Sequence, residues 1–315
     1  MTAPDASAPA RPRRALVLAV LGVLVLAVVV VLVVRTLRTT PGVQSFIAAY
    51  TGAAPLPADA PVGVPAWVAW QHGLNAVFLL FTVRSGWRLH RAERPSVFWT
   101  RRNTGMVRTR NPPVRIGLDL WSHYVGDTLW ALNGVVFLVL LLTTGQWQRI
   151  VPLDWAIVPA AVSTALQYAS LDWPTTNGWI DYNALQVLSY FLVVFVAGPL
   201  ALLTGLRLSP GFAARLRPLD KVLSVRATKR IHFWTMVFLV AFTVVHVVLV
   251  LTTGAIRNLN HMYAVRDDGS PVGLIVFLVA VLGTALLVLA VRPSVVKQVA
   301  ARAGTLLERP QRPRR

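Results

Sequence analysis

The chain contains no cysteine among its 315 residues and few acidic side chains, with 12 Asp and Glu against 31 Lys and Arg. Without cysteine it can form no disulfide, no thiolate-bound zinc site and no Cys-x-x-Cys-His attachment of haem, so a metal would have to be bound by histidine or carboxylate. Charged residues make up 14% of the chain and hydrophobic residues 55%, which is far from the composition of a soluble domain. The composition therefore indicates an integral membrane protein.

Six apolar runs are each close to the roughly 20 residues that a helix needs to cross a bilayer. They are Ala15 to Val34, Ala66 to Leu89, Leu120 to Thr144, Ala184 to Leu206, Ile231 to Thr253 and Val272 to Val291. We therefore predict an all-α fold, an integral membrane bundle of six transmembrane helices. The first run is long for a signal peptide and has no small-residue cleavage site after it, so we interpret it as a retained span.

The basic residues gather on one side of this predicted bundle. That side has three of them up to Arg14, nine in 84–115, seven in 207–230 and seven in 292–315, while the opposite side has five, interspersed with six Asp. Because short cytoplasmic loops collect Lys and Arg, we expect a multi-pass protein of the cell membrane with both termini in the cytoplasm. The net charge of +19 needs no nucleic-acid partner, since topology and anionic lipid account for it.

Two histidines, His232 and His246, lie within one apolar run. At about 1.5 Å and about 100° per residue, a helix places them roughly 21 Å apart along its axis and only about 40° apart around it. An unpartnered imidazole in hydrocarbon costs several kcal/mol, so such a pair marks a candidate functional site. Hydrogen bonding to a neighbouring helix is the alternative interpretation.

Four of the histidines fall at two depths. His72 is near the outer end of the second run and His123 near the inner end of the third, so we expect His72 to pair with His246 and His123 with His232. Two histidines from different helices at each level suit bis-imidazole ligation of a planar cofactor. Haem b fits this pattern better than zinc, which needs a third or fourth ligand.

The other two histidines are expected to be less important. His90 lies at the cytoplasmic boundary and is either an interfacial side chain or a weaker rival to His123. His261 lies in an outer loop and is expected at the surface, with a quinone-site or partner-docking role as the alternative.

Other polar side chains fall within or beside the spans. Asp127, one turn after His123, is a candidate for proton handling or an interhelical hydrogen-bond partner. Asn75 and Asn133 are expected to form interhelical hydrogen bonds. Four basic residues near the inner level either neutralise haem propionates or only follow the topology: Arg84, Arg88, Lys229 and Arg230.

Four segments occur in a recognisable order. They are QHGLNAVFLLFTVRSGWRLH, LWSHYVGDTLWALNGVVFLVLLLTTGQWQRIVP, YNALQVLSYFLVVFVAGPLALLTGLRLSPGF and the histidine doublet with thirteen residues between its members. Together, over roughly residues 42–270, they resemble the bacterial di-haem cytochrome b superfamily. This group includes the membrane subunits of formate dehydrogenases, thiosulfate reductases, nickel–iron hydrogenases and molybdopterin oxidoreductases of the sulfite-oxidase type. The resemblance implies a four-helix core holding two b haems, ligated by the same two histidine pairs.

These observations divide the chain into five parts. They are a cytoplasmic tail (1–14), an extra helix (15–35), the four-helix di-haem core (66–253), a second extra helix (272–292) and a basic cytoplasmic tail (293–315). Residues 1–14 and 303–315 are expected to be disordered, and 153–169 to form a helix along the outer membrane surface.

We predict a di-haem cytochrome b that transfers electrons across the bilayer as one subunit of an oxidoreductase complex. It would connect quinone or quinol with an extracytoplasmic partner, which the resemblance suggests is a molybdopterin oxidoreductase. The alternatives are a stand-alone transmembrane reductase of an external small acceptor and a haem-free anchor or transporter. The direction of electron flow and the side of the quinone site are left open.

Overall fold

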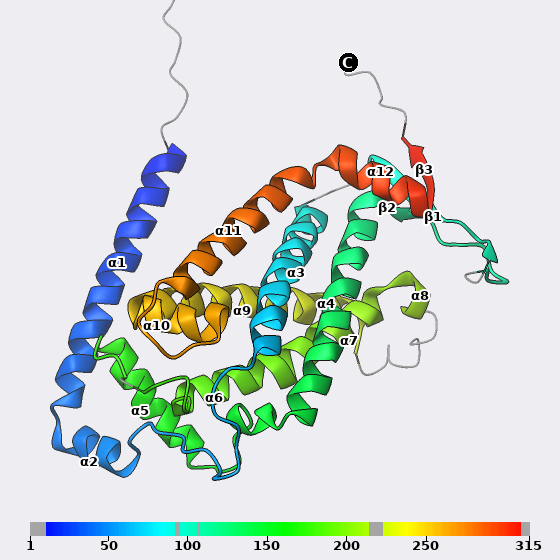
Figure 1. Ribbon diagram of the computed structural model, residues 1–315. Helices are drawn as coiled ribbons and strands as arrows, with labels where there is room; N and C mark the ends of the chain where they lie inside the picture. The colour runs from blue at the N-terminus through cyan, green and yellow to red at the C-terminus, as the bar shows by residue number, and fades with distance from the viewer. Residues whose placement is uncertain (1–10, 92–94, 106–107, 175, 214–222, 310–315) are drawn as a thin grey trace, which may run out of the picture.

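The computed structural model describes residues 11–91, 95–105, 108–174, 176–213 and 223–309. Within these ranges, six helical segments are long and apolar enough to cross a membrane. They are α1 (Arg11–Arg38), α3 (Ala66–Arg91), α4 (Leu118–Thr143), the continuous segment α6–η3–α7 (Ala184–Phe191, Leu192–Ala197 and Gly198–Leu208), α9 (Val225–Thr252) and α11 (Val272–Ala290). The six predicted spans and the all-α membrane bundle are confirmed (Figure 1).

Shorter helices connect these spans or follow them. They are α2 (Pro41–Ala49), η2 (Gln146–Arg149), α5 (Ile157–Ala169), α8 (Pro210–Ala213), α10 (Ala255–Leu259), η5 (Asn260–Ala264) and α12 (Pro293–Ala303). The helix predicted for 153–169 is α5, which starts later because the Asp154 carboxylate accepts a hydrogen bond from the Ala156 amide in a preceding turn, at 3.0 Å.

Two spans begin at residues whose side chains satisfy the first free amides of the helix. Ser224 precedes α9, and its Oγ accepts a hydrogen bond from the Ala227 amide at 3.2 Å. Asn183 precedes α6, and its side chain and that of Gln186 each bond to the other residue's amide. These caps fix where the spans start, and therefore the depth of every side chain along them.

The core of the bundle consists of two helical hairpins, with α3 packed on α4 and α7 packed on α9. The Trp130 indole donates a hydrogen bond to Asn75 Oδ1 at 2.8 Å, and the Asn133 amide donates one to the Gln71 carbonyl at 3.4 Å. The predicted interhelical role of both asparagines is thus confirmed. Close backbone contacts between the two hairpins are sparse in the described ranges, so side chains and any cofactor occupy the space between them.

The span formed by α6, η3 and α7 contains a π-helical stretch. Pro199 lies at the start of α7 and has no amide hydrogen to donate to the preceding turn. The turns before it are widened into the π-helix Leu192–Ala197. The span remains continuous but changes its side-chain register at mid-membrane.

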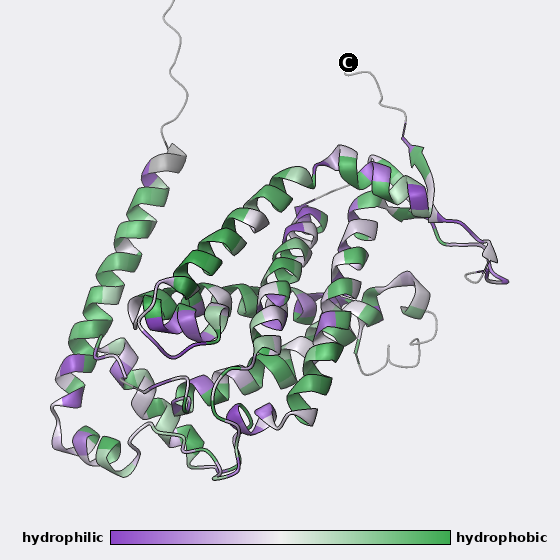
Figure 2. Ribbon diagram, in the orientation of Figure 1, coloured by the Kyte–Doolittle hydropathy of each residue, from purple (hydrophilic) through white to green (hydrophobic). Residues whose placement is uncertain are grey.

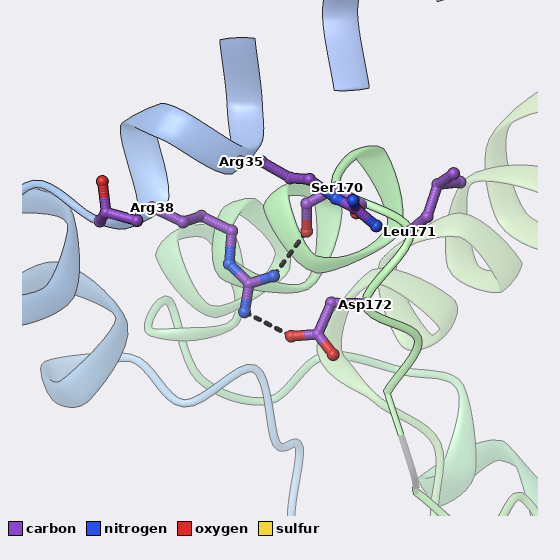
Figure 3. Close-up of a pocket in the computed structure, with 6 residues that line it drawn as sticks. Arg35, Arg38, Ser170, Leu171 and Asp172 are labelled. Carbon is purple, nitrogen blue, oxygen red and sulfur yellow. Dashed lines mark hydrogen bonds and ion pairs between the residues drawn. The ribbon is translucent and has the colours of Figure 1, made fainter. Parts of the chain in front are cut away.

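The two extra helices, α1 and α11, lie outside the core; α11 is hydrophobic along its length, and α1 is hydrophobic except near its ends (Figure 2). α11 packs on α3, α10 and η5, whereas α1 packs on α5 and α2. Two arginines attach the end of α1 to the end of α5 and line a pocket there (Figure 3). Arg35 donates to the Ser170 carbonyl at 2.9 Å, and Arg38 pairs with Asp172 at 2.7 Å.

A small antiparallel sheet lies at the end of the bundle opposite α2 and α5 (Figure 1). Its order is β2–β1–β3, formed by Ile116–Gly117, Val97–Arg101 and Gly304–Glu308. The prediction of disorder is therefore wrong for residues 303–308, and also for residues 11–14, which form the start of α1. Residues 1–10 and 310–315 lie outside the described residues. β3 is held in place by pairing with β1, some 200 residues earlier, and the Trp99 indole donates to the Ala300 carbonyl at 2.9 Å.

Candidate cofactor site

The structure brings together the two histidine pairs that the sequence predicts. The outer pair, His72 on α3 and His246 on α9, has ring centres 6.1 Å apart. The inner pair, His123 on α4 and His232 on α9, has ring centres 6.3 Å apart. We name the pairs for the sides predicted from the charge distribution.

These separations fit two ligands of one haem iron. With a metal–nitrogen bond of about 2 Å, and a ring centre about 1 Å behind the nitrogen, imidazoles on opposite sides of one metal ion have centres roughly 6 Å apart. Among the described residues, no group of three or more His, Asp or Glu side chains could hold a metal ion. The donor set therefore suits an iron whose other ligands come from a porphyrin, and does not suit tetrahedral zinc.

The two pairs lie at different depths in the bundle. The difference in depth is about the same on both hairpins. Ser85 contacts His123 and follows His72 by thirteen residues on α3, which corresponds to about 20 Å. On α9, fourteen residues separate His232 from His246, which corresponds to about 21 Å. The pairs thus form two levels across the bundle.

Hydroxyl groups contact the inner pair. Ser85 Oγ lies 2.9 Å from Nδ1 of His123, and Thr204 Oγ1 lies 2.9 Å from Nδ1 of His232. Each hydroxyl comes from the helix that packs against the histidine's own helix, α3 for α4 and α7 for α9. Both imidazoles are therefore held at Nδ1, and Nε2 is not used by these two contacts.

Aromatic rings surround the outer pair. His246 stacks on Phe242 with ring centres 5.6 Å apart and meets Tyr190 edge-on at 6.2 Å. His72 meets Tyr263 edge-on at 6.5 Å. In the part of the chain that the structure describes, neither outer imidazole has a hydrogen-bond partner, so shape rather than polarity positions this pair.

A protein-family model described as prokaryotic cytochrome b561 matches residues 63–264, a range that includes both histidine pairs. The chain belongs to the prokaryotic cytochrome b561 family. It is a bacterial b-type cytochrome, a multi-pass membrane protein that binds haem b and transfers electrons across the membrane. The matched range leaves α1 and α11 outside.

One curated relative of the cytochrome is a putative protein-methionine-sulfoxide reductase subunit, YedZ1, from Azospira oryzae. The two sequences are 28% identical over 204 residues, which cover 59% of this chain and 88% of the relative. No solved structure matches the chain.

Asp127, the predicted proton-handling group, lies beside the inner pair. Its Oδ2 is 3.5 Å from Nε2 of His123, one helical turn away. This distance is long for a hydrogen bond, so the contact does not decide which nitrogen of His123 carries the proton.

Two of the four basic candidates for haem propionates have other partners in the cytochrome. Arg84 donates to the Val288 and Val291 carbonyls at the end of α11, each at 3.3 Å, and Arg88 pairs with Asp119 at 2.8 Å. Lys229 and Arg230 are exposed on the first turns of α9.

His90 and His261 take different positions from the four paired histidines. His90 stacks on Phe233, with ring centres 4.9 Å apart, and it is His123 that meets His232. His261 is only 6% exposed, so the prediction that it lies at the surface is wrong. The loop folds back so that Nε2 of His261 lies 2.8 Å from Asp267, below the Trp179 ring.

Asp267 links three segments of the outer loops. Hydrogen bonds from Arg257, Asn177 and His261 hold the pKa of its carboxyl well below the usual value. Asp267 in turn raises the pKa of the Arg257 guanidinium. This ionised cluster fixes the loop that leads from α9 into α11.

Arg149 is the most deeply buried cation described, at 1% exposure, and its role was not predicted from the sequence. Its guanidinium donates to the carbonyls of Pro61, Gly178, Trp179 and Ile180 at 2.8–3.2 Å, and lies 4.8 Å above the Tyr182 ring. A buried charge held only by carbonyls and a ring is an anchor for the outer loops rather than a reactive group.

Sequence reasoning also missed Ser85 and Thr204. Each is followed by a glycine, and a Cβ on Gly86 or Gly205 would lie 3.1 or 3.5 Å from Cε1 of the adjacent histidine. The available signal in the sequence was a hydroxyl residue followed by a glycine, a pattern that occurs on two different spans.

Proposed function

We propose that the cytochrome holds two haem b groups, one ligated by His72 and His246 and one by His123 and His232. Through them it transfers electrons across the bilayer between quinone or quinol and a protein on the outer face. The observation that carries this proposal is the pair of imidazole separations, 6.1 and 6.3 Å, repeated at two levels about 20 Å apart.

The haem supplies reversible one-electron chemistry when it is bound. The protein holds the haem and spaces the two sites. The four imidazoles hold the iron, and α9 acts as an uninterrupted spacer that carries one ligand of each pair. Apolar side chains on the spans exclude water from the path. Lys229 and Arg230 at the inner level remain the candidates for propionate charges, with Asp127 the candidate for proton handling.

The orientation follows from the charge distribution. With 26 of the 31 basic residues on one side, both termini lie in the cytoplasm under the positive-inside rule. The outer face then carries the Asp267 cluster, α5 and the turn before α5, where Trp155 is 89% exposed. A face that combines acidic and exposed aromatic groups suits a protein partner better than anionic lipid.

The partner on this face is proposed to be a molybdopterin oxidoreductase. The superfamily resemblance points to that class, and the name of the relative from Azospira oryzae supports a subunit role and suggests oxidised protein methionine as the final acceptor. The stand-alone reductase is the second candidate. Family membership argues against a haem-free anchor or transporter.

Purification in a mild detergent tests the subunit role. We expect a catalytic subunit to co-purify, and the quinol-reduced cytochrome to pass electrons to it. If nothing co-purifies, and the quinol-reduced cytochrome alone reduces a soluble small acceptor at a high rate, the stand-alone reductase replaces the subunit.

A further inference from the structure

We propose that Ser85 and Thr204 are positioning residues of the inner haem site. They fix which nitrogen of His123 and His232 faces the iron, and they lower the reduction potential of the inner haem relative to the outer one. This inference rests on the proposed di-haem function and adds to it a direction of electron transfer between the two haems.

Carbonyl acceptors surround both hydroxyls. Ser85 Oγ lies 2.9 Å from the Phe81 carbonyl oxygen and 3.0 Å from that of Thr82, and Thr204 Oγ1 lies 2.6 Å from the Leu200 carbonyl oxygen and 3.1 Å from that of Ala201. A hydroxyl has one hydrogen to donate. In the proposed arrangement this hydrogen goes to a carbonyl, and each hydroxyl oxygen accepts a hydrogen bond from its imidazole.

This arrangement assigns the tautomer of both inner histidines. Because each hydroxyl accepts from Nδ1, the imidazole carries its proton on Nδ1 and leaves the Nε2 lone pair free. Nε2 is then the nitrogen that binds the iron. The protein thus prepares both inner ligands before the cofactor arrives.

Burial makes these two hydrogen bonds effective. Ser85 is 6% exposed, Thr204 4% and His123 9%, so water does not compete for the same atoms. Gly86 and Gly205 lie directly against the Cε1 atoms of the two rings. Each ring is held at Nδ1 by a hydroxyl and at Cε1 by a backbone with no side chain.

An electronic effect accompanies the positioning. A ligand imidazole that donates its Nδ1 hydrogen becomes a stronger electron donor to the metal, which stabilises ferric over ferrous iron. A hydroxyl that itself donates to a carbonyl is a better acceptor, which strengthens the effect. The outer imidazoles lack such partners among the described residues, so the inner haem has the lower potential and electrons pass from the inner level to the outer one.

The test is a spectroscopic redox titration of the purified, haem-loaded cytochrome carrying Ser85→Ala, Thr204→Val or both. The inner wave is identified as the one that His123→Ala removes. We expect each single variant to raise the inner midpoint, by an amount equivalent to about a fivefold change in the ferric-to-ferrous ratio, and to leave the outer midpoint in place. Ser85→Thr and Thr204→Ser keep the hydroxyl and should restore the original value.

The chain offers matched controls. Thr235→Val removes a buried hydroxyl from α9 whose one hydrogen-bond partner among the described residues is the Ile231 carbonyl, and Ser163→Ala removes a fully buried hydroxyl from α5. Neither should move either midpoint.

The outcomes separate the two proposals. A wild-type protein with one wave or none contradicts the di-haem function itself. If the wild type shows two waves, three results overturn the inference alone. They are that Ser85→Ala and Thr204→Val leave the inner midpoint unchanged, that they shift both midpoints together, or that they lower the inner midpoint. If a variant binds less haem, the midpoint of the fraction that does load still gives the answer.

Discussion

The inner and outer histidine pairs have nearly the same geometry and different surroundings. Their ring separations differ by 0.2 Å (6.1 against 6.3 Å), yet hydroxyls hold the inner pair by Nδ1 and aromatic rings pack around the outer pair. The same ligand separation is therefore reached in two ways. In the inner pair, the proposed hydrogen bonds specify the electronic state of each ligand. In the outer pair, packing against aromatic rings specifies only the position of each ligand.

The two pairs are therefore expected to be sensitive to different kinds of substitution. A hydrogen-bonded ligand depends on single polar atoms, whereas a packed ligand depends on the volume of its neighbours. Substitutions at each pair can therefore separate the two kinds of support.

Replacing one histidine by alanine has the largest expected effect. Each iron needs both axial imidazoles, and metal affinity falls steeply when a ligand is lost, so His72→Ala and His246→Ala should remove only the outer haem and His123→Ala only the inner one. Haem content by pyridine extraction should fall by half, with one redox wave left. His90→Ala is the control and should keep both waves; losing one there would show that the inner assignment is wrong.

Adding a methyl group tests how tightly the inner pair is packed. A Cβ at residue 86 would lie 3.1 Å from His123, and one at residue 205 would lie 3.5 Å from His232. Gly86→Ala should therefore displace the ring at a cost of about 1–3 kcal/mol and lower inner haem occupancy, whereas Gly205→Ala should be nearly neutral. Equal occupancy in the two variants would contradict the packing described.

Removing an aromatic ring tests the outer pair. Phe242→Ala deletes the ring stacked on His246, and we expect it to weaken outer haem binding by about 1 kcal/mol while the inner wave is unchanged. Phe238→Ala, one turn earlier on α9 and 43% exposed, is the matched control. A loss from the inner wave in Phe242→Ala would contradict the separation of the two levels.

Acid should weaken the outer loops, and this is the smallest of the expected effects. The pKa of Asp267 is lower in the folded chain than its ordinary value near 4, so Asp267 stabilises the fold above about pH 4 and loses this contribution as the pH falls below it. Asp267→Asn should lower the melting temperature slightly at pH 7 and remove the difference at low pH. A melting temperature of the variant equal to that of the wild type at pH 7 would show that the cluster adds no stability.

The spans and the histidine pairs were predictable because their signals are local. Hydropathy gives the spans, and helical rise alone gives the 14-residue spacing on α9. The hydroxyl partners were not, because Ser85 and His123 are 38 residues apart and meet only when α3 packs on α4. The same reason explains β3, whose partner strand lies some 200 residues away, and His261, which is buried by contacts with Trp179 and Asp267.

The haem content of the purified wild-type chain, measured together with a redox titration, decides whether the cytochrome holds two haems. We expect two haem b per chain and two separate one-electron waves, with the lower one assigned to the inner pair. A single haem per chain, or a titration that fits one wave and disappears entirely in His123→Ala, would contradict this expectation.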